Sequence, residues 1–301
     1  MAAPREIIPG RYYMITRRCV RRQFLLRPDQ RTNQCFLFCL ALAAQYSGVR
    51  VVCFLAMSNH YHAIVHDPLG TLPLFLEHLH KLCAKALNAR WSRWENLWAT
   101  EQTCATHLVN PSDVLDKVLY TLCNPLAEHL VERVTDWPGA NSYRAMLTGR
   151  TIEVERPRDF FREHGSTPDV ARLTLARPPG FEDWDQPKWE EYLTGLVTGI
   201  EERTRRERLE RGIKLRGRKA VLRASELDTP DGAEPRRKLR PSVACADAVA
   251  RTRVLTQLVL FRRAHEVARL RVAAGELEAV FPYGTYRMRL MGHRCARAPS
   301  D

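Results

Sequence analysis

The sequence lacks any hydrophobic run long enough to cross a membrane. A membrane-spanning helix needs about 20 predominantly apolar residues, and the longest apolar run here is residues 35–44. The first residues also lack the charged and apolar regions of a signal peptide. We therefore expect no membrane association and a cytoplasmic location.

Cysteine pairs at metal-binding or redox spacing are also missing. The nine cysteines are scattered, and no two of them form a Cys-x-x-Cys pair, which excludes the usual zinc ribbon and dithiol motifs. Most lie inside apolar runs, as expected for small core residues in a reducing compartment.

Acidic residues are under-represented relative to basic ones. The 301 residues include 47 Lys and Arg but 34 Asp and Glu, a formal net charge of +13, while 45% of the residues are hydrophobic. The apolar fraction is sufficient for a large core. The positive charge favours a polyanionic partner, and without a membrane segment that partner is expected to be nucleic acid.

The first half of the chain predicts an α+β fold. Its pattern gives strand, helix, strand, strand, helix and strand, which is the split βαβ plan of a ferredoxin-like antiparallel sheet with helices on one face. A further helix follows, capped by Ser112 or Asp113 and kinked after Pro125. The expected strands are residues 11–19, 51–56, 60–66 and 103–109. The first expected helix is capped by Asp29 or Thr32, runs through residues 35–44 and ends at Gly48, and the other helices are residues 72–91 and 111–124.

The composition changes near residue 150. Five prolines between residues 157 and 187 predict a mostly irregular connection. An arginine-rich helical pattern covers residues 201–223, a Pro/Gly-rich stretch with a basic run covers 229–241, and a second helical pattern covers 246–274. We therefore expect a catalytic domain at 1–150 and a basic, mostly helical accessory region with irregular linkers at 151–301.

Two short motifs carry the candidate chemistry. On a strand, His60 and His62 point to one face, because side chains alternate. On a helix, Tyr120 and Asn124 lie one above the other. If the strand and the helix meet, two imidazoles and an amide oxygen can hold a divalent cation beside a tyrosine hydroxyl, a set of groups suited to cutting a phosphodiester.

A basic cluster near the first strand is a candidate DNA-binding surface. Arginines contact the phosphate backbone of single-stranded DNA, and neighbouring aromatic side chains stack on its bases. The predicted contact residues are Tyr13, Arg17, Arg18, Arg21 and Arg22.

These motifs resemble the HUH-type single-tyrosine transposases, specifically the REP-associated tyrosine transposase branch. The similarity spans about residues 9–147 and rests on residues 11–29, 57–65, 120–126 and 136–144. It departs from the family at Ser58, where proline is common, and at residues 98–102, which lack an arginine that relatives often have.

The resemblance implies a ferredoxin-like nuclease fold and an active site with a tyrosine nucleophile and three metal ligands. Tyr120 would be the nucleophile, and His60, His62 and Asn124 would bind Mg²⁺ or Mn²⁺. The implied activity is cleavage and strand transfer on single-stranded, hairpin-containing DNA through a 5′-phosphotyrosine, by a monomer or a homodimer.

Two other functions remain open at this point. A non-cleaving DNA-binding regulator derived from a transposase would keep the fold and the charge. A zinc hydrolase would use His60 and His62, but such sites usually carry an aspartate two positions further, where this chain has Ile64.

Overall fold

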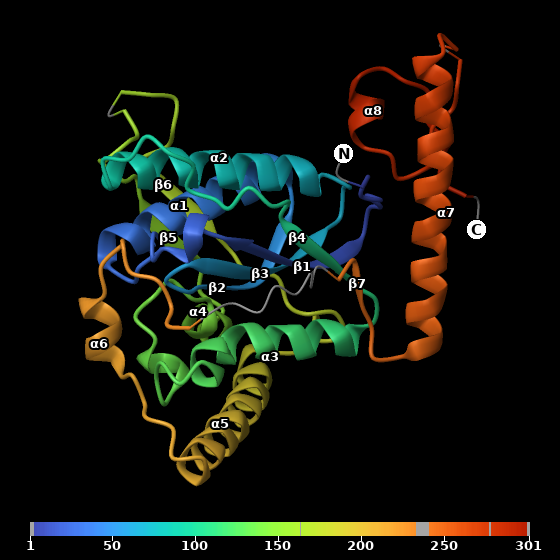
Figure 1. Cartoon of the computed structure of the whole chain (residues 1–301). Helices are drawn as coiled ribbons and strands as arrows, with labels where there is room; N and C mark the ends of the chain where they lie inside the picture. The colour runs from blue at the N-terminus through green and yellow to red at the C-terminus, as the bar shows by residue number, and fades with distance from the viewer. Residues whose placement is uncertain (1–2, 163, 233–240, 277, 300–301) are drawn as a thin grey trace.

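A five-stranded sheet forms the centre of the protein (Figure 1). The computed structural model describes residues 3–162, 164–232, 241–276 and 278–299, so the predicted basic run at residues 236–240 lies outside the described residues. The strand order is β2-β3-β1-β4-β7; the first four strands are antiparallel to one another, and β7 pairs with β4 in parallel. The strands are β1 (Arg11–Arg18), β2 (Arg50–Ala56), β3 (His60–Asp67), β4 (Cys104–Leu108) and β7 (Val243–Ala244).

The central pair of strands fixes which side chains face each side of the sheet. In the β1–β3 pair, Thr16 lies opposite His62, and Ile15 lies opposite Ala63. Directly opposed residues of antiparallel strands point to the same face. His62 and Thr16 therefore share one face, and Tyr61 points to the other.

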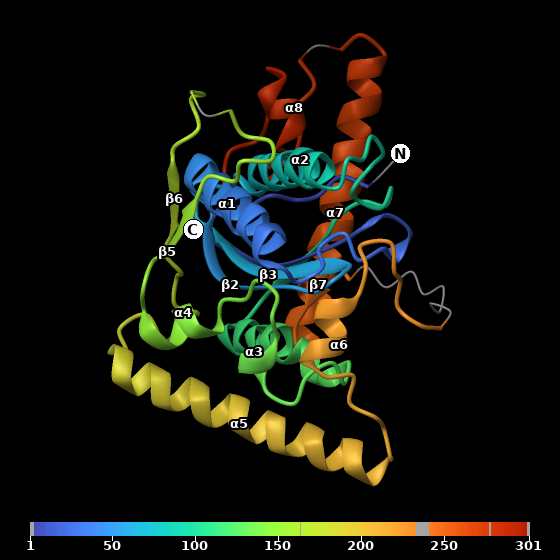
Figure 2. The ribbon, with the colours of Figure 1, turned by 90° about the vertical axis from the view of Figure 1, so that its left-hand side faces the viewer.

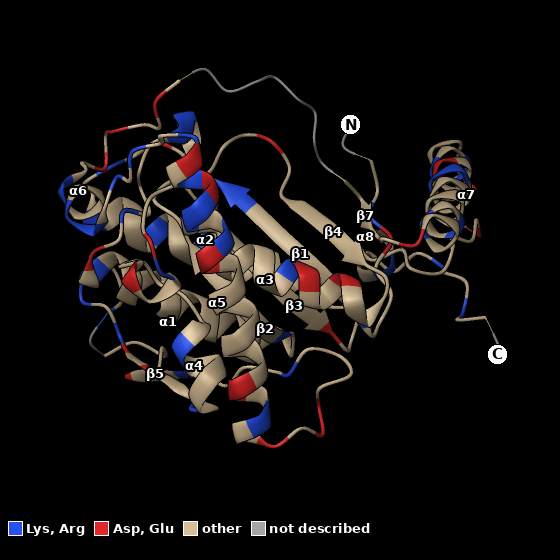
Figure 3. Ribbon diagram, turned by 90° about the horizontal axis from the view of Figure 1, so that it is seen from below, with Lys and Arg blue, Asp and Glu red and all other residues tan. Residues whose placement is uncertain are grey.

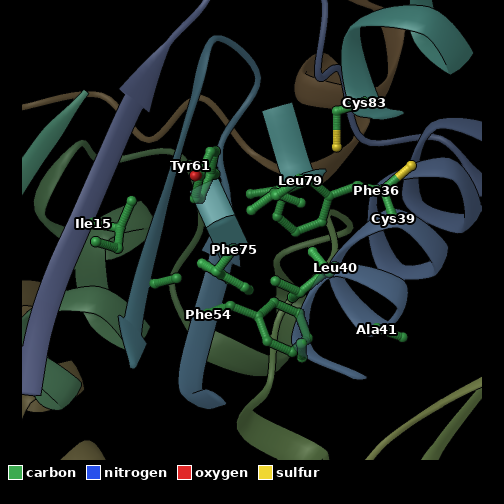
Figure 4. Packing of buried hydrophobic residues seen from close by; sticks show 14 of the residues in the cluster. Ile15, Phe36, Cys39, Leu40, Ala41, Phe54, Tyr61, Phe75, Leu79 and Cys83 are labelled. Carbon is green, nitrogen blue, oxygen red and sulfur yellow. The ribbon is translucent and has the colours of Figure 1, made fainter. Parts of the chain in front are cut away.

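Two helices cover the Tyr61 face. They are α1 (Gln30–Ser47) and α2 (Leu72–Arg90), and their apolar sides pack on the sheet around Tyr61, Phe36 and Phe54 (Figure 4). The Asp29 side chain accepts a hydrogen bond from the Thr32 amide and caps α1. This arrangement confirms the predicted α+β, ferredoxin-like sheet with its two helices.

Helix α3 (Pro111–Ala127) lies on the opposite face. Asn110 caps it, and the Asp113 side chain reaches back to the Asn110 amide, so the predicted cap at Ser112 or Asp113 is wrong. The helix continues through Pro125 and ends two residues later. The missing proline amide removes one hydrogen bond from the last turns without breaking the helix before Asn124.

The segment after α3 continues into α4 (Tyr143–Thr148) and is fixed to strand β2. The Trp137 indole donates to the Ala56 carbonyl at 2.9 Å. The Ser142 hydroxyl accepts from the Phe54 amide at 2.9 Å and contacts the Phe54 carbonyl at 3.1 Å. Gly139 has no room for a side chain, because a Cβ there would lie 2.6 Å from the Ala56 carbonyl oxygen.

Residues after 150 add elements to both faces of the sheet, the face covered by α1 and α2 and the face covered by α3 (Figure 2). Strands β5 (Ile152–Glu155) and β6 (Val170–Leu173) form an antiparallel pair against α1, where an irregular connection was expected. Helix α5 (Gln186–Glu210) packs on α3, and β7 adds to the main sheet. The predicted helix at 201–223 is divided between the end of α5 and the short α6 (Arg218–Arg223), because residues 211–217 leave helical geometry around Gly212 and Gly217.

Helix α7 (Ala248–Ala273) stands beside β7 at the edge of the molecule, and the short α8 (Arg287–Leu290) follows it (Figure 1). No helix in the described part of the chain has the length and apolar content needed to span a bilayer. The predicted boundary near residue 150 stays a prediction, since residues on both sides of it contribute to the same two hydrophobic cores.

Candidate functional site

The two histidines of β3 converge on the α3 side of the sheet. Their Nε2 atoms are 3.1 Å apart, and their rings meet edge to face. His62 is 5% exposed. Neighbouring side chains on the same face come from β1, where Arg18 lies opposite His60 and Thr16 lies opposite His62.

The remaining ring nitrogens are held by side-chain oxygens. His60 Nδ1 lies 2.7 Å from Asn59 Oδ1, and His62 Nδ1 lies 2.9 Å from the Thr16 hydroxyl. A carboxamide oxygen can only accept, so His60 donates from Nδ1 and its Nε2 carries a lone pair. The Thr16 hydroxyl can accept in the same way from His62. Both Nε2 atoms can therefore present lone pairs to one point.

Burial keeps both imidazoles neutral. Loss of solvation, followed by the charge of Arg18, lowers the pKa of His60 to about 4. Loss of solvation, followed by the neighbouring His60, lowers the pKa of His62 well below its usual value. A neutral imidazole is the form that binds metal ions.

Helix α3 brings Tyr120 to the histidines, and Asn124 follows one helical turn later beside Tyr120. The rings of His62 and Tyr120 meet edge to face with centroids 5.6 Å apart. Tyr120 is 49% exposed, whereas Asn124 is 5% exposed. The Asn124 Oδ1 atom is buried and has no hydrogen-bond partner among the described residues. The strand and the helix thus meet, with a free amide oxygen beside an accessible tyrosine.

The surroundings of Tyr120 set the state of its hydroxyl. Partial burial and the charge of Glu128 raise its pKa, and the Asn124 side chain counteracts them. The Lys117 ammonium lies 5.5 Å from the ring centroid, one helical turn before it. The phenol is therefore protonated at neutral pH in the protein alone, and a further positive charge is needed to favour the phenolate.

A cavity of about 460 Å³ opens beside His60. Arg18, Arg22 and Arg216 line it together with Glu128 and Asp231. Residues of α6 and of the chain after it, including Val221 and Ala224, also line this cavity. The Arg22 guanidinium donates to the Gly232 carbonyl of the same segment at 3.0 Å. Figure 3 shows the basic end of β1 and the basic α6 on this side of the molecule.

The predicted DNA-binding residues separate into two groups. Tyr13 is 2% exposed and packs against His107 on the other face, so the expectation that it stacks on bases is wrong. Arg17 shares that face and holds the following loop by donating to Thr103 Oγ1 at 2.6 Å and to the Ala99 carbonyl at 3.2 Å. The alternation of β1 explains both positions, because odd-numbered residues of this strand face α1 and α2.

Arg18, Arg21 and Arg22 lie nearer the site. Arg18 and Arg22 line the cavity, and Arg21 is exposed in the turn that follows β1. Arg21 and Arg22 both have left-handed backbone conformations, with φ of 50° and 61°. Strained non-glycine residues of this kind concentrate at functional sites.

Four residues near the site were not expected from the sequence. Thr16 depends on the register of two strands distant in sequence, and Arg216 depends on the path of the chain after α5. The positions of Lys117 and Glu128 near the site could have been predicted from helical spacing. Lys117 lies three residues before Tyr120, and Glu128 lies four residues after Asn124, on the same helical face.

The described residues contain no group of three or more His, Cys, Asp or Glu side chains arranged to hold a metal ion. Two imidazoles converge at this site, so a metal ion held here would take any third protein ligand from another residue type. The buried amide oxygen of Asn124 is a donor of that kind.

Comparison with known proteins finds distant similarity in structure. No protein-family model matches the chain, and no curated protein matches it. Similar solved structures include a REP-associated tyrosine transposase bound to a REP hairpin, with a TM-score of 0.42 and 17% identity over 56% of this chain and 94% of that chain. Another, provisionally described as a transposase from Deinococcus radiodurans R1, has a TM-score of 0.30 and 15% identity over 39% of this chain and 93% of that chain.

Both structures are described as transposases, the group that the sequence motifs resemble. At these levels of similarity they carry no argument about individual residues. The chemistry assigned to the site therefore rests on the geometry of this chain.

Proposed function

We propose that this protein is a metal-dependent single-stranded DNA endonuclease and strand transferase that acts on hairpin-containing DNA. Tyr120 is the nucleophile, and His60, His62 and Asn124 are the metal ligands. The observation that carries the proposal is the convergence of the two Nε2 atoms, 3.1 Å apart, beside an exposed tyrosine.

The donor set fits a divalent cation. Metal–imidazole bonds of about 2.0–2.1 Å place two adjacent nitrogen ligands roughly 3 Å apart, which matches the separation of the Nε2 atoms of His60 and His62. The hydrogen bonds to Asn59 and Thr16 orient the rings, as outer-shell partners of metal-binding histidines commonly do. The unpartnered Oδ1 of Asn124 supplies an oxygen donor. Mg²⁺ and Mn²⁺ both accept oxygen ligands, and imidazole favours Mn²⁺.

A bound cation would polarise a phosphate oxygen and favour the phenolate form of a nearby tyrosine. Tyr120 then attacks the phosphorus atom through its phenolate oxygen. The bond between phosphorus and the 3′ oxygen breaks, and that oxygen leaves as a 3′-hydroxyl after taking up a proton. The DNA stays attached as a 5′-phosphotyrosine, so a second 3′-hydroxyl can reverse the step and join strands.

The surface beside the site suits a nucleic-acid strand. Arg18, Arg22 and Arg216 line the cavity next to His60, and the net charge of the chain is +13. Cationic side chains attract the phosphate backbone through a salt-dependent term. We assign residues 1–150 to the catalytic domain and residues 151–301 to an accessory region that adds one wall of this cavity, in a protein that works as a monomer or a homodimer.

The test compares two tyrosine variants. Purified wild type, Tyr120→Phe and Tyr46→Phe are incubated with Mn²⁺ and labelled hairpin-forming single-stranded oligonucleotides, and products are separated on a denaturing gel. Tyr46 is 61% exposed on α1, which covers the face of the sheet opposite His62, and it serves as the matched control. We expect a covalent adduct with wild type and Tyr46→Phe and none with Tyr120→Phe. An adduct that persists in Tyr120→Phe contradicts the assignment.

A non-cleaving DNA-binding regulator is the other outcome of the same experiment. It predicts that wild-type protein retards the hairpin on a native gel and gives no adduct with any divalent cation.

A further inference from the structure

A second cavity, of about 300 Å³, lies on the opposite face of the sheet from His62. It is lined by the first described residues of the chain, by strands β1, β4 and β7, and by helix α7, and it is partly open to solvent. Tyr13 and His107 form its floor, and Arg5, Arg11 and Arg262 line its walls. None of these residues belongs to the proposed nuclease site.

Several polar atoms in this cavity lack partners. The Tyr13 hydroxyl, His107 Nδ1 and Arg262 Nε are buried, and no hydrogen bond of standard geometry reaches them from the described residues. Tyr13 is only 2% exposed, so its hydroxyl has no access to bulk water. Leaving a buried polar group without a hydrogen-bond partner destabilises the folded protein. Three such groups on residues that line one cavity could gain partners from a polar ligand.

The charges around the cavity indicate the sign of that ligand. Arg11 is paired with Glu6 at 2.7 Å, and Arg262 contacts the Ser242 hydroxyl at 3.3 Å. Arg5 donates to the Thr103 carbonyl at 2.8 Å, and burial lowers its pKa. Three guanidinium groups face one carboxylate, which leaves a formal excess of two positive charges. Enclosed positive charge with free N–H and O–H groups favours an anion.

We propose that this cavity is a binding site for a phosphomonoester group. A phosphomonoester carries about −1.5 to −2 charges at neutral pH, which matches the excess of positive charge better than one carboxylate does. Its oxygens accept from guanidinium groups and from a tyrosine hydroxyl. The volume lies at the lower end of the range for small-molecule sites, roughly 300–1,000 Å³, so a phosphate with an attached group such as a nucleoside fits in size.

Isothermal titration calorimetry tests the site directly. Inorganic phosphate, a nucleoside 5′-monophosphate and the matching nucleoside are titrated into the full-length protein without divalent cation. We expect saturable binding of the two phosphate probes and none of the nucleoside. An oligonucleotide with and without a 5′-phosphate shows whether the phosphate can be a nucleic-acid end: binding of the phosphorylated form alone assigns a DNA end, and binding of neither form assigns a small phosphate compound.

Two variants locate the binding in this cavity. Arg262→Gln and Tyr13→Phe each remove one donor that lacks a standard hydrogen bond, and each should weaken phosphate binding about tenfold or more, because charge-assisted hydrogen bonds are the stronger class. Arg263→Gln is the matched control, because Arg263 is the next residue of α7 and is exposed. His62→Ala should retain binding, which separates this cavity from the proposed nuclease site.

Three results would overturn the proposal. They are the absence of saturable phosphate binding, equal losses in Arg262→Gln and Arg263→Gln, and equal affinity for sulfate. Thermal unfolding with and without phosphate provides a second readout, because a ligand of the folded state raises the melting temperature. That rise should be present in wild type and reduced in Tyr13→Phe, a substitution that removes one buried hydroxyl and keeps the aromatic ring in the core.

Discussion

Replacing Thr16 with valine removes one hydroxyl from the edge of the two-histidine site and preserves the shape of the side chain. The hydroxyl lies 2.9 Å from His62 Nδ1. When this hydroxyl accepts a hydrogen bond from Nδ1–H, the proton of the neutral ring stays on Nδ1. The lone pair of His62 is then on Nε2, which faces His60. Valine offers no acceptor, so the alternative tautomer, with the proton on Nε2, becomes available and competes with metal binding.

The expected loss follows from the role of this contact. Removing an outer-shell partner of a metal-binding histidine typically costs 10- to 100-fold in metal affinity, or roughly 1.4–2.7 kcal/mol. The hydrogen bond is partly buried, which limits replacement of the hydroxyl by bulk water. We therefore expect Thr16→Val to weaken Mn²⁺ binding by at least about tenfold, without a large change in fold.

Titration of Mn²⁺ followed by electron paramagnetic resonance measures this loss. Thr106→Val is the matched control, because Thr106 is another strand threonine whose hydroxyl makes one short hydrogen bond, to the Pro241 carbonyl at 2.8 Å, outside the site. The reasoning is refuted if Thr16→Val binds Mn²⁺ as tightly as wild type, or if both variants lose affinity equally.

Two further predictions concern stability. Ser142→Ala should destabilise the fold by about 1–3 kcal/mol in urea unfolding, because it leaves the Phe54 amide of β2 buried and unpaired; an unchanged unfolding midpoint would show that another group satisfies this amide. Burial lowers the pKa of His80 to about 3, so the unfolded chain takes up a proton below its ordinary pKa of about 6.5 and the folded chain does not. Stability should therefore fall as the pH decreases from about 6.5 toward 3, by up to about 1.4 kcal/mol per pH unit from this residue. Urea unfolding at several pH values measures the slope, and a slope that is the same in His80→Gln would contradict this assignment.

Local sequence patterns predicted the elements that form the site. Alternation over residues 60–66 and helical spacing over 111–124 act within one segment, so β3 and α3 appeared near their observed bounds. The same alternation in β1 would have placed Tyr13 beside Ile15 in the core, and the basic neighbours of Tyr13 led to the opposite interpretation.

Features that depend on distant parts of the chain were not predictable in the same way. The contact of Thr16 with His62 requires the β1–β3 register. Strand β7 has two residues and exists through its pairing with β4. The four-residue strands β5 and β6 are too short for a pattern and gain their order from packing on α1.

The central tyrosine of the His-Tyr-His motif explains how the two imidazoles are held. Tyr61 is fully buried on the α2 side, and its hydroxyl lies 2.7 Å from His80 Nε2. The Trp98 indole in turn donates to the His80 carbonyl at 3.0 Å. Because a one-residue shift of β3 would exchange its two faces, this buried network fixes the register that points His60 and His62 toward α3. A metal site requires rigidly held ligands, and here that rigidity comes from the core on the far side of the sheet. A substitution that weakens the packing of Tyr61 should therefore displace His60 and His62, although Tyr61 is not part of the site.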